Sequence, residues 1–221
     1  MPRRAFEKAL SSLQDEVLIL GNMVDKAIYR AVESLKKRDL QEAQRIIEDD
    51  LKINQKRYEI EEKALLLIAT QQPMARDLRF IAAVLNIITE LERMGDHAEG
   101  IAKISLMLGS EPPIKPLIDI PRMAEKARDM LRRSLDALVA RDAEAARQTA
   151  AEDDEVDGLQ DQVYRELLTY MFQDPKAITR ATYLLWVAHN LERIGDRVTN
   201  ICERVVFTVT GKMEEMRVST Y

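Results

Sequence analysis

A five-residue motif occurs twice in this chain, one hundred residues apart. Glu92-Arg93-Met94-Gly95-Asp96 in the first half is matched by Glu192-Arg193-Ile194-Gly195-Asp196 in the second half. Around each copy, apolar residues recur three and four positions apart, which is typical of one face of an amphipathic helix. Any fold for this chain must therefore place the same acidic pair on a long helix twice.

The apolar pattern continues along the chain and divides it into six helices. We expect them at about 4–37, 39–70, 74–108, 121–140, 142–172 and 176–209. Residues 109–121 hold four of the seven prolines, which marks a linker. No strand pattern competes with the helices. The sequence therefore predicts an all-α fold of two tandem three-helix bundles related by an internal pseudo-twofold repeat, with residues 1–110 and 121–221 on either side of a linker at 111–120.

The charge and the few cysteines and histidines limit the function. The formal net charge is −5, so the chain lacks the excess of basic residues that nucleic-acid binding needs. Cys202 is the single cysteine, and His97 and His189 are the two histidines, so any metal must be held by oxygen. The apolar runs are shorter than the roughly 20 residues that span a bilayer. We therefore expect a cytoplasmic protein that binds no nucleic acid.

The repeated acids fall on the side of the helix where the core is expected. At about 100° per residue, Asp96 lies about 40° from Glu92, and Glu99 lies about 20° away on the other side. The apolar residues Ile81 and Leu85 fall in the same sector of the helix. The second copy of the motif repeats this arrangement, so these acids continue the apolar stripe instead of lying opposite it.

Further acids are expected to face each motif from the preceding helix. An antiparallel hairpin that turns near residue 72 places Asp50 level with about residue 95 and Asn54 with about residue 91. A hairpin that turns near residue 174 places Asp153 level with about residue 195 and Asp157 with about residue 191. Each half should therefore hold an acidic patch between two helices.

Crowded carboxylates repel one another unless cations neutralise them. Basic side chains are one source of cations, but we expect Arg93 and Arg193 to point about 100° away from the neighbouring glutamates. Bound metal is the interpretation that we favour, and oxygen ligands select iron, manganese, magnesium or calcium over zinc. A solvated acidic face that pairs with arginines is the alternative. The candidate metal ligands are Asp50, Asn54, Glu92, Asp96, Glu99, Asp153, Asp157, Glu192 and Asp196.

The motif glycines also need an explanation, because a glycine inside a helix costs about 1 kcal/mol relative to alanine. Gly95 and Gly195 indicate the close approach of another backbone or of ions at the acidic patches. A plain helix–helix contact explains them equally well.

Residues 92–102 and 192–202 resemble the paired signature of the PhoU family, as do residues 73–79 and Leu168-Thr169-Tyr170-Met171. The resemblance covers about residues 5–207. It implies two three-helix bundles whose motif acids bind multinuclear metal clusters in some members. Carried over to this chain, the motif acids are Glu92, Asp96, Glu192 and Asp196, with Asp50 and Asp153 on the facing helices.

The resemblance also implies a role without catalysis. Members are negative regulators of the phosphate regulon and of phosphate uptake, and they link the ATPase subunit of a phosphate ABC transporter to a membrane sensor histidine kinase. We further expect a homodimer that associates with the inner face of the membrane through these partners. Asn54 stands where the family has an acid, Gly100 replaces an asparagine and Thr199 replaces an acid, so two unequal metal sites are expected.

Three other functions compete with this one. A ferritin-like di-iron carboxylate oxidase also has inward-facing acids, but such sites use Glu-x-x-His, and no glutamate here has a histidine three residues later. A nucleotide enzyme would need a Gly-x-x-x-x-Gly-Lys loop, which the chain lacks. An accessory protein of a different phosphate carrier would share the fold and differ in its partner.

Overall fold

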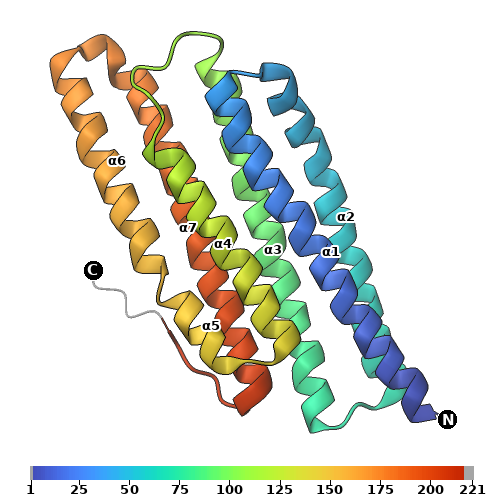
Figure 1. Ribbon diagram of the computed structural model, residues 1–221. Coiled ribbons are helices and arrows are strands. Elements are labelled where there is room, and N and C mark those ends of the chain that lie inside the picture. The colour runs from blue at the N-terminus through green and yellow to red at the C-terminus, as the bar shows by residue number, and fades with distance from the viewer. Residues whose placement is uncertain (1, 217–221) are drawn as a thin grey trace.

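The computed structural model describes residues 2–216, and nearly all of them are helical (Figure 1). The long helices lie side by side with their axes roughly aligned, and α3 and α7 run next to each other through the centre. The predicted all-α fold is confirmed. The elements within these residues are α1 (Pro2–Lys37), α2 (Leu40–Gln71), α3 (Ala75–Leu108), α4 (Asp119–Ala140), α5 (Ala143–Ala150), α6 (Asp153–Gln173), the 3-10 helix η1 (Pro175–Ala177) and α7 (Ile178–Thr210).

The fifth expected helix, at 142–172, is two helices in the structure. α5 ends at Ala150 and α6 begins at Asp153. The break contains a bond from the backbone N–H of Glu152 to the carbonyl oxygen of Thr149, three residues back, which tightens the chain out of the α-helical pattern. The Glu152 carboxylate turns towards α4, where Lys126 and Arg133 bind it at 2.8 and 2.5 Å. The prediction of one continuous helix was wrong, because the Glu152 N–H bonds three residues back instead of four and the helix restarts at Asp153.

Matching turns begin the second helix of each half. The Asp39 carboxylate accepts a hydrogen bond from the backbone N–H of Glu42 at 2.9 Å, and Asp142 accepts from the N–H groups of Glu144 and Ala145 at 3.0 Å. These bonds satisfy N–H groups that have no partner within a helix. Arg38 and Arg141 precede the caps in the left-handed conformation, with φ of 57° and 55°. The repeat therefore extends to the backbone of its turns.

A continuous hydrophobic core runs through both halves. It draws on every α-helix, with fully buried side chains such as Leu20, Ile81, Met123 and Ile201. Across the two halves, the Arg128 guanidinium of α4 makes two hydrogen bonds, at 2.9 and 2.8 Å, to the Asp25 carboxylate of α1. The halves thus pack closely together. The division at residues 111–120 into two repeats remains a prediction.

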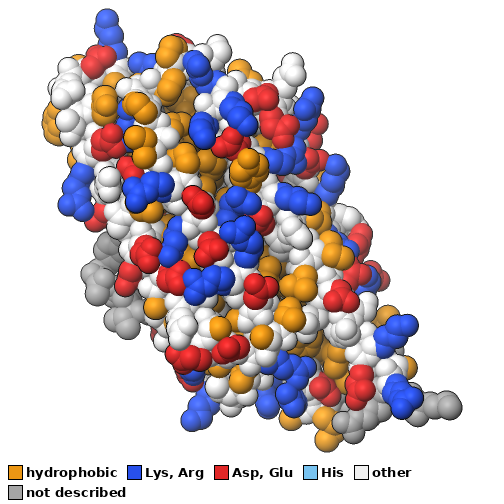
Figure 2. Space-filling model, in the orientation of Figure 1, with side chains coloured by type: hydrophobic (Ala, Val, Ile, Leu, Met, Phe, Trp, Pro, Cys, Tyr) orange, Lys and Arg blue, Asp and Glu red, His pale blue; other side chains and the backbone are white. Residues whose placement is uncertain are grey.

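The surface carries both signs of charge. Figure 2 shows Lys and Arg side chains interspersed with Asp and Glu over this face of the molecule, with apolar side chains between them. Within the described residues, no helix is both long enough and apolar enough to cross a membrane.

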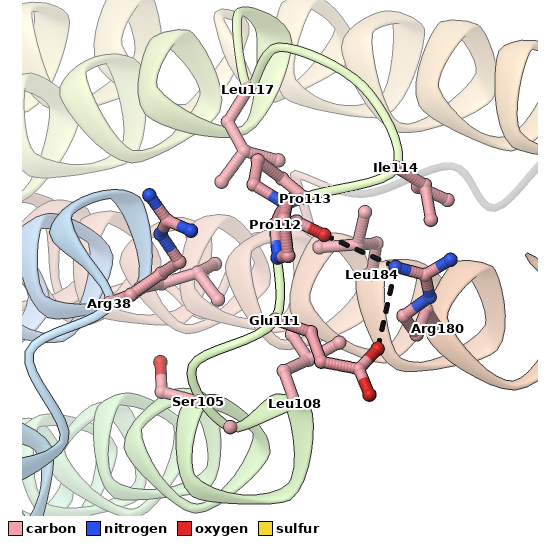
Figure 3. A pocket seen from close by; sticks show the side chains of 12 residues that line it. Arg38, Ser105, Leu108, Glu111, Pro112, Pro113, Ile114, Leu117, Arg180 and Leu184 are labelled. Atoms are coloured by element: carbon pink, nitrogen blue, oxygen red, sulfur yellow. Dashed lines mark hydrogen bonds and ion pairs between the residues drawn. The ribbon is translucent and has the colours of Figure 1, made fainter.

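The proline-rich segment between α3 and α4 is tied to α6 and α7 by polar contacts. The Arg180 guanidinium donates a hydrogen bond to the Pro112 carbonyl oxygen at 3.2 Å and lies 3.5 Å from the Glu111 carboxylate (Figure 3). The buried ammonium of Lys115 pairs with Glu166 of α6. Beneath the segment is a cavity of about 30 Å³, room for one or two water molecules. This segment therefore acts as a fixed connector.

Candidate functional site

The structure brings the facing acids to the motif glycines, as the hairpin register predicts. A methyl group added at Gly95 of α3 would lie 3.3 Å from Asp50 Oδ1 and 3.1 Å from Ile53 Cγ2 of α2. A methyl group at Gly195 of α7 would clash with Asp153 Oδ1 of α6. The helices approach closely at these points, and the space is taken by Ile53 and Asp50 at Gly95 and by Asp153 at Gly195. The close approach is confirmed, and the neighbour is a side chain instead of a backbone.

The first acidic patch, defined as Asp50, Asn54, Glu92, Asp96 and Glu99, concentrates negative charge around one buried carboxyl group. Asp50 is 8% exposed, and its Oδ2 accepts a hydrogen bond from Asn54 Nδ2 at 2.9 Å. Burial raises the pKa of Asp50 to about 6, helped by the carboxylates of Asp96, Glu99 and Glu92 and opposed by the Asn54 hydrogen bond. Burial and Asp96 also raise the pKa of Glu92. The patch therefore holds carboxyl groups that are costly to ionise together.

Basic side chains reach the first acidic patch, contrary to the expectation for Arg93. Its guanidinium lies 3.3 Å from the Asp96 carboxylate and 3.6 Å from Glu92, and Lys103 lies 2.6 Å from Glu99. The angular argument failed because it follows Cβ directions, whereas an arginine side chain is long enough to fold back along the helix. Part of the charge is thus neutralised by the chain itself, which favours the solvated-face alternative for these acids.

The second acidic patch, defined as Asp153, Asp157, Glu192 and Asp196, is more deeply buried. Asp153 is 5% exposed, and the Asp196 side chain is 4% exposed against 38% for Asp96. Arg193 lies 2.5 Å from Asp196 and neutralises part of this patch, and the expectation that it points away from Glu192 stays a prediction. His189 Nδ1 is 3.4 Å from Glu192, but its side chain is mostly exposed, as expected of a surface residue. The two patches differ in burial and in their neighbours.

A set of polar contacts joins α3 and α7, the helices that carry the two motifs, and was missed by the sequence reasoning. Arg197 and Asn200 donate to Glu90, and His97 Nδ1 lies 3.0 Å from Asn190 Oδ1. His97 is half-buried, and burial is the main cause that lowers its pKa. The internal repeat could have drawn attention to these residues, because positions 90 and 190, 97 and 197, and 100 and 200 are equivalent in the two halves.

The patches contain oxygen atoms that could act as ligands of a hard cation, although their side chains are not arranged to hold a metal ion. Carboxylate and amide oxygens supply the chemistry, and Asp50 Oδ1 is buried without a hydrogen-bond partner among the described residues. Across those same residues, no group of three or more His, Cys, Asp or Glu side chains is arranged to hold a metal ion. Metal binding would therefore require side chains such as Asp96 to turn towards Asp50. The ligand set stays a prediction.

These features define a class of helical proteins, in which two similar halves each carry an acidic patch between neighbouring helices. A family model described as PhoU domain matches residues 17–105 and 120–205, which are the parts of the chain that carry the two patches. The chain belongs to the PhoU family.

Relatives match along almost the whole chain. The protein named phosphate-specific transport system accessory protein PhoU homolog from Clostridium acetobutylicum is 41% identical over 217 residues, which cover 98% of this chain and 99% of that protein. The relative of the same name from Rhizobium meliloti is 38% identical over 94% of this chain and 88% of its own length.

Solved structures share the fold. The crystal structure of PhoU from Pseudomonas aeruginosa has a TM-score of 0.88 and 34% identity, covering 94% of this chain and 100% of that chain. The phosphate transport system regulatory protein PhoU from Streptococcus pneumoniae has a TM-score of 0.88 and 32% identity, covering 95% of this chain and 99% of its own.

Proposed function

We propose that this protein is an accessory protein of a phosphate-specific transport system and acts as a negative regulator of phosphate uptake and of the phosphate regulon. The observation that carries the proposal is the match to relatives of that name over 98% of this chain and 99% of the relative. In this role the chain performs no catalysis and works by binding. Its adaptor partners are the ATPase subunit of a phosphate ABC transporter and a sensor histidine kinase.

The proposal places the protein in the cytoplasm, at the inner face of the membrane when its partners are there, and as a homodimer. Two features support an adaptor of this kind. The chain offers long helical surfaces of mixed charge, and the two halves are fixed to each other by a shared core. A rigid body of this type can hold two partners at a set distance, which is what an adaptor requires.

The most direct experiment uses a strain that lacks its own PhoU protein and carries a phosphate-starvation reporter. Expression of the full chain should lower reporter activity in high phosphate, and the tagged chain should retain the transporter ATPase and the kinase from detergent-solubilised membranes. A chain that does neither contradicts the proposal. Retention of a phosphate carrier of another type, in place of the ABC transporter, would instead identify the chain as the accessory protein of that carrier.

We also propose that the acidic patches bind divalent or trivalent metal ions, with iron, manganese or magnesium as the candidates. Asp50, Glu92, Asp96 and Glu99, with Asn54, would hold metal in the first half, and Asp153, Asp157, Glu192 and Asp196 in the second half. Bound metal supplies positive charge that offsets the repulsion between these carboxylates. The raised pKa of Asp50 supports this proposal, because it marks a carboxyl group that the surrounding cations do not fully compensate.

A further inference from the structure

The outer side of α2 carries a row of apolar residues that the core does not use. Leu51, Tyr58 and Leu65 follow one another at intervals of seven residues and are 72%, 58% and 52% exposed. Seven residues are close to two helical turns, so the three side chains lie in a line about 21 Å long. α2 lies at one edge of the molecule and packs against α1 and α3, with Ile53 and Ile60 of its inner side in the core (Figure 1). An aligned apolar row on the outer side is typical of a surface that binds another protein.

The aromatic ring at the centre of this row is held in place on the surface. The Arg57 guanidinium lies 4.9 Å from the centre of the Tyr58 ring, which is a cation–π contact. The same guanidinium lies 3.0 Å from the Glu61 carboxylate, which fixes the arginine in turn. A side chain that is already held loses little freedom on binding, and tyrosine is among the residues that dominate binding energy in interfaces. Tyr58 is therefore suited to anchor a partner.

Two exposed glutamates flank the apolar row. At about 100° per residue, Glu48 lies about 60° and Glu62 about 20° from Leu51 around the helix. Glu48 accepts a hydrogen bond from the neutral Gln44 at 3.1 Å. Neither glutamate forms an ion pair with any residue in the described part of the chain. We call the surface formed by Glu48, Leu51, Tyr58, Glu62 and Leu65 the outer edge of α2.

The lysines of α2 are bound elsewhere and do not neutralise these glutamates. Lys52 lies 2.6 Å from the Asp49 carboxylate. Lys56 and Lys63 both pair with Glu16 of α1. The outer edge of α2 is therefore apolar along its length and negative beside it, and a partner that complements it brings positive charge.

The equivalent helix of the second half lacks these features. The repeat relates α2 to α6, and it matches the buried Ile53 with the buried Val156, 103 positions later. At the first two apolar positions α6 has aspartates, and at the two acidic positions it has an alanine and an arginine, namely Asp154, Asp161, Ala151 and Arg165. The apolar row and its acidic flank thus belong to α2 alone of these two helices, and the fold that the halves share does not require them.

We propose that the outer edge of α2 binds an amphipathic helix of a partner protein, in which lysines or arginines flank an apolar stripe. The stripe packs along Leu51, Tyr58 and Leu65, and the basic side chains pair with Glu48 and Glu62. A row about 21 Å long matches about 14 residues of the partner helix. The proposal concerns the chemistry of the bound helix, and it does not depend on the proposed regulatory role.

The test uses the full chain and a fluorescent synthetic peptide of about 18 leucines and lysines, with the leucines three and four positions apart so that they form one helical face. Fluorescence anisotropy at about 150 mM salt measures binding, because exposed charges are then largely screened. The peptide should bind with a micromolar Kd. A peptide of the same composition in scrambled order, and one with glutamate in place of lysine, should each bind about tenfold more weakly. Equal binding of the scrambled peptide, or no saturable binding of the amphipathic peptide, would overturn the proposal.

A first variant replaces the apolar row with the residues that α6 carries. Leu51→Asp with Tyr58→Asp should weaken binding of the amphipathic peptide about tenfold. The two added charges would strengthen a general attraction to a basic peptide, so a loss of affinity comes from the row itself. Both positions are exposed, and circular dichroism checks that the variant is folded. Unchanged or tighter binding would contradict the proposed surface.

A second pair of variants separates local from general charge. Glu48→Gln with Glu62→Gln should weaken binding several-fold, whereas Asp154→Asn with Asp161→Asn removes the same charge from α6 and should leave binding unchanged. Equal effects of the two pairs would show that the peptide responds to net charge, against the proposal.

A second copy of this chain is the other occupant to test. Sedimentation without peptide should give the same mass for the wild-type chain and for Leu51→Asp with Tyr58→Asp. A dimer that this variant loses would place another copy of the chain on the outer edge of α2 and would refute a separate partner helix.

Discussion

Arg197 of α7 lies 3.3 Å from the Glu90 carboxylate of α3, and this ion pair joins the two halves of the molecule at their longest shared boundary. Asn200 donates to the same carboxylate oxygen at 3.1 Å. The repeat-related contact is neutral, because Asn190 stands in the place of Glu90 and His97 in the place of Arg197. Of these two repeat-related contacts, one is therefore ionic and the other is neutral.

Glu90→Gln should lower the free energy of unfolding by about 1–2 kcal/mol, because it leaves a half-buried guanidinium with a weaker acceptor. Urea unfolding at low and at high salt measures this loss, which should shrink at high salt as the ion pair of the wild-type protein is screened. Asn190→Ala is the matched control, since it removes the neutral contact, and its effect should not depend on salt. An equal salt dependence in both variants would mean that the Glu90–Arg197 pair contributes nothing specific.

Gly195→Ala should destabilise the protein, although alanine is the better helix former by about 1 kcal/mol. The added methyl group meets Asp153 Oδ1, and the buried Asp153 side chain has little space to move. Gly95→Ala should cost less, because the nearest atom to its methyl group is 3.1 Å away. Thermal unfolding ranks the two variants. Adding Asp153→Ala to Gly195→Ala should recover stability, and a double variant as unstable as the single one would exclude the proposed clash.

The raised pKa of Asp50 predicts a loss of stability as the pH rises. The folded protein holds this proton up to about pH 6, whereas the unfolded chain releases it near the ordinary aspartate pKa of 3.8. The folded state therefore binds more protons between these values, and the free energy of unfolding should fall across pH 4–6 by about 2 kcal/mol and then level off. Asp50→Asn should remove this part of the pH dependence. The measurement is the difference between wild-type and variant urea midpoints over pH 4–7, and a difference that is constant with pH would contradict it.

Metal should raise the thermal stability of the protein if the acidic patches bind it, because binding to the folded state alone shifts the unfolding equilibrium. Glu92→Gln with Asp96→Asn should remove the metal of the first half, and Glu192→Gln with Asp196→Asn that of the second half. Elemental analysis of each variant, after addition of manganese or ferrous iron, gives the metal content. Unchanged content in both variants would show that the ligands were assigned wrongly.

The sequence predicted the helices well where residues close together in the chain determine the helix and its ends. Apolar periodicity placed α1, α2, α3 and α7 within a few residues. Asp39 and Asp142 mark helix starts through their side-chain caps, and Gly109 marks a helix end through its backbone conformation. The break at Ala151 and Glu152 was not predictable in this way. It contains neither glycine nor proline, and the Glu152 carboxylate at the break pairs with Lys126 and Arg133, which are distant in sequence.

In the candidate site too, the contacts that were predicted follow from helix geometry, and the contacts that were missed depend on side-chain rotamers and on how the halves pack. Hairpin geometry was sufficient to bring Asp50 to Gly95 and Asp153 to Gly195, since both pairs follow from helix rise and turn position. The contacts of Arg93 and Arg193 depend on side-chain rotamers, which periodicity does not determine. The Glu90–Arg197 pair depends on how the halves dock, and no local pattern specifies that.

The continuous core and the paired contacts between α3 and α7 have a consequence for the chain as a whole. Residue 90 meets residue 197, and residue 190 meets residue 97, which is the reciprocal pattern of two subunits around a twofold axis. The protein is thus built like a dimer whose subunits have been fused and have then become unlike. Residues 1–110 and 111–221, produced as separate polypeptides, should assemble one to one when mixed, and the 3.3 Å ion pair should favour this heterodimer over either homodimer.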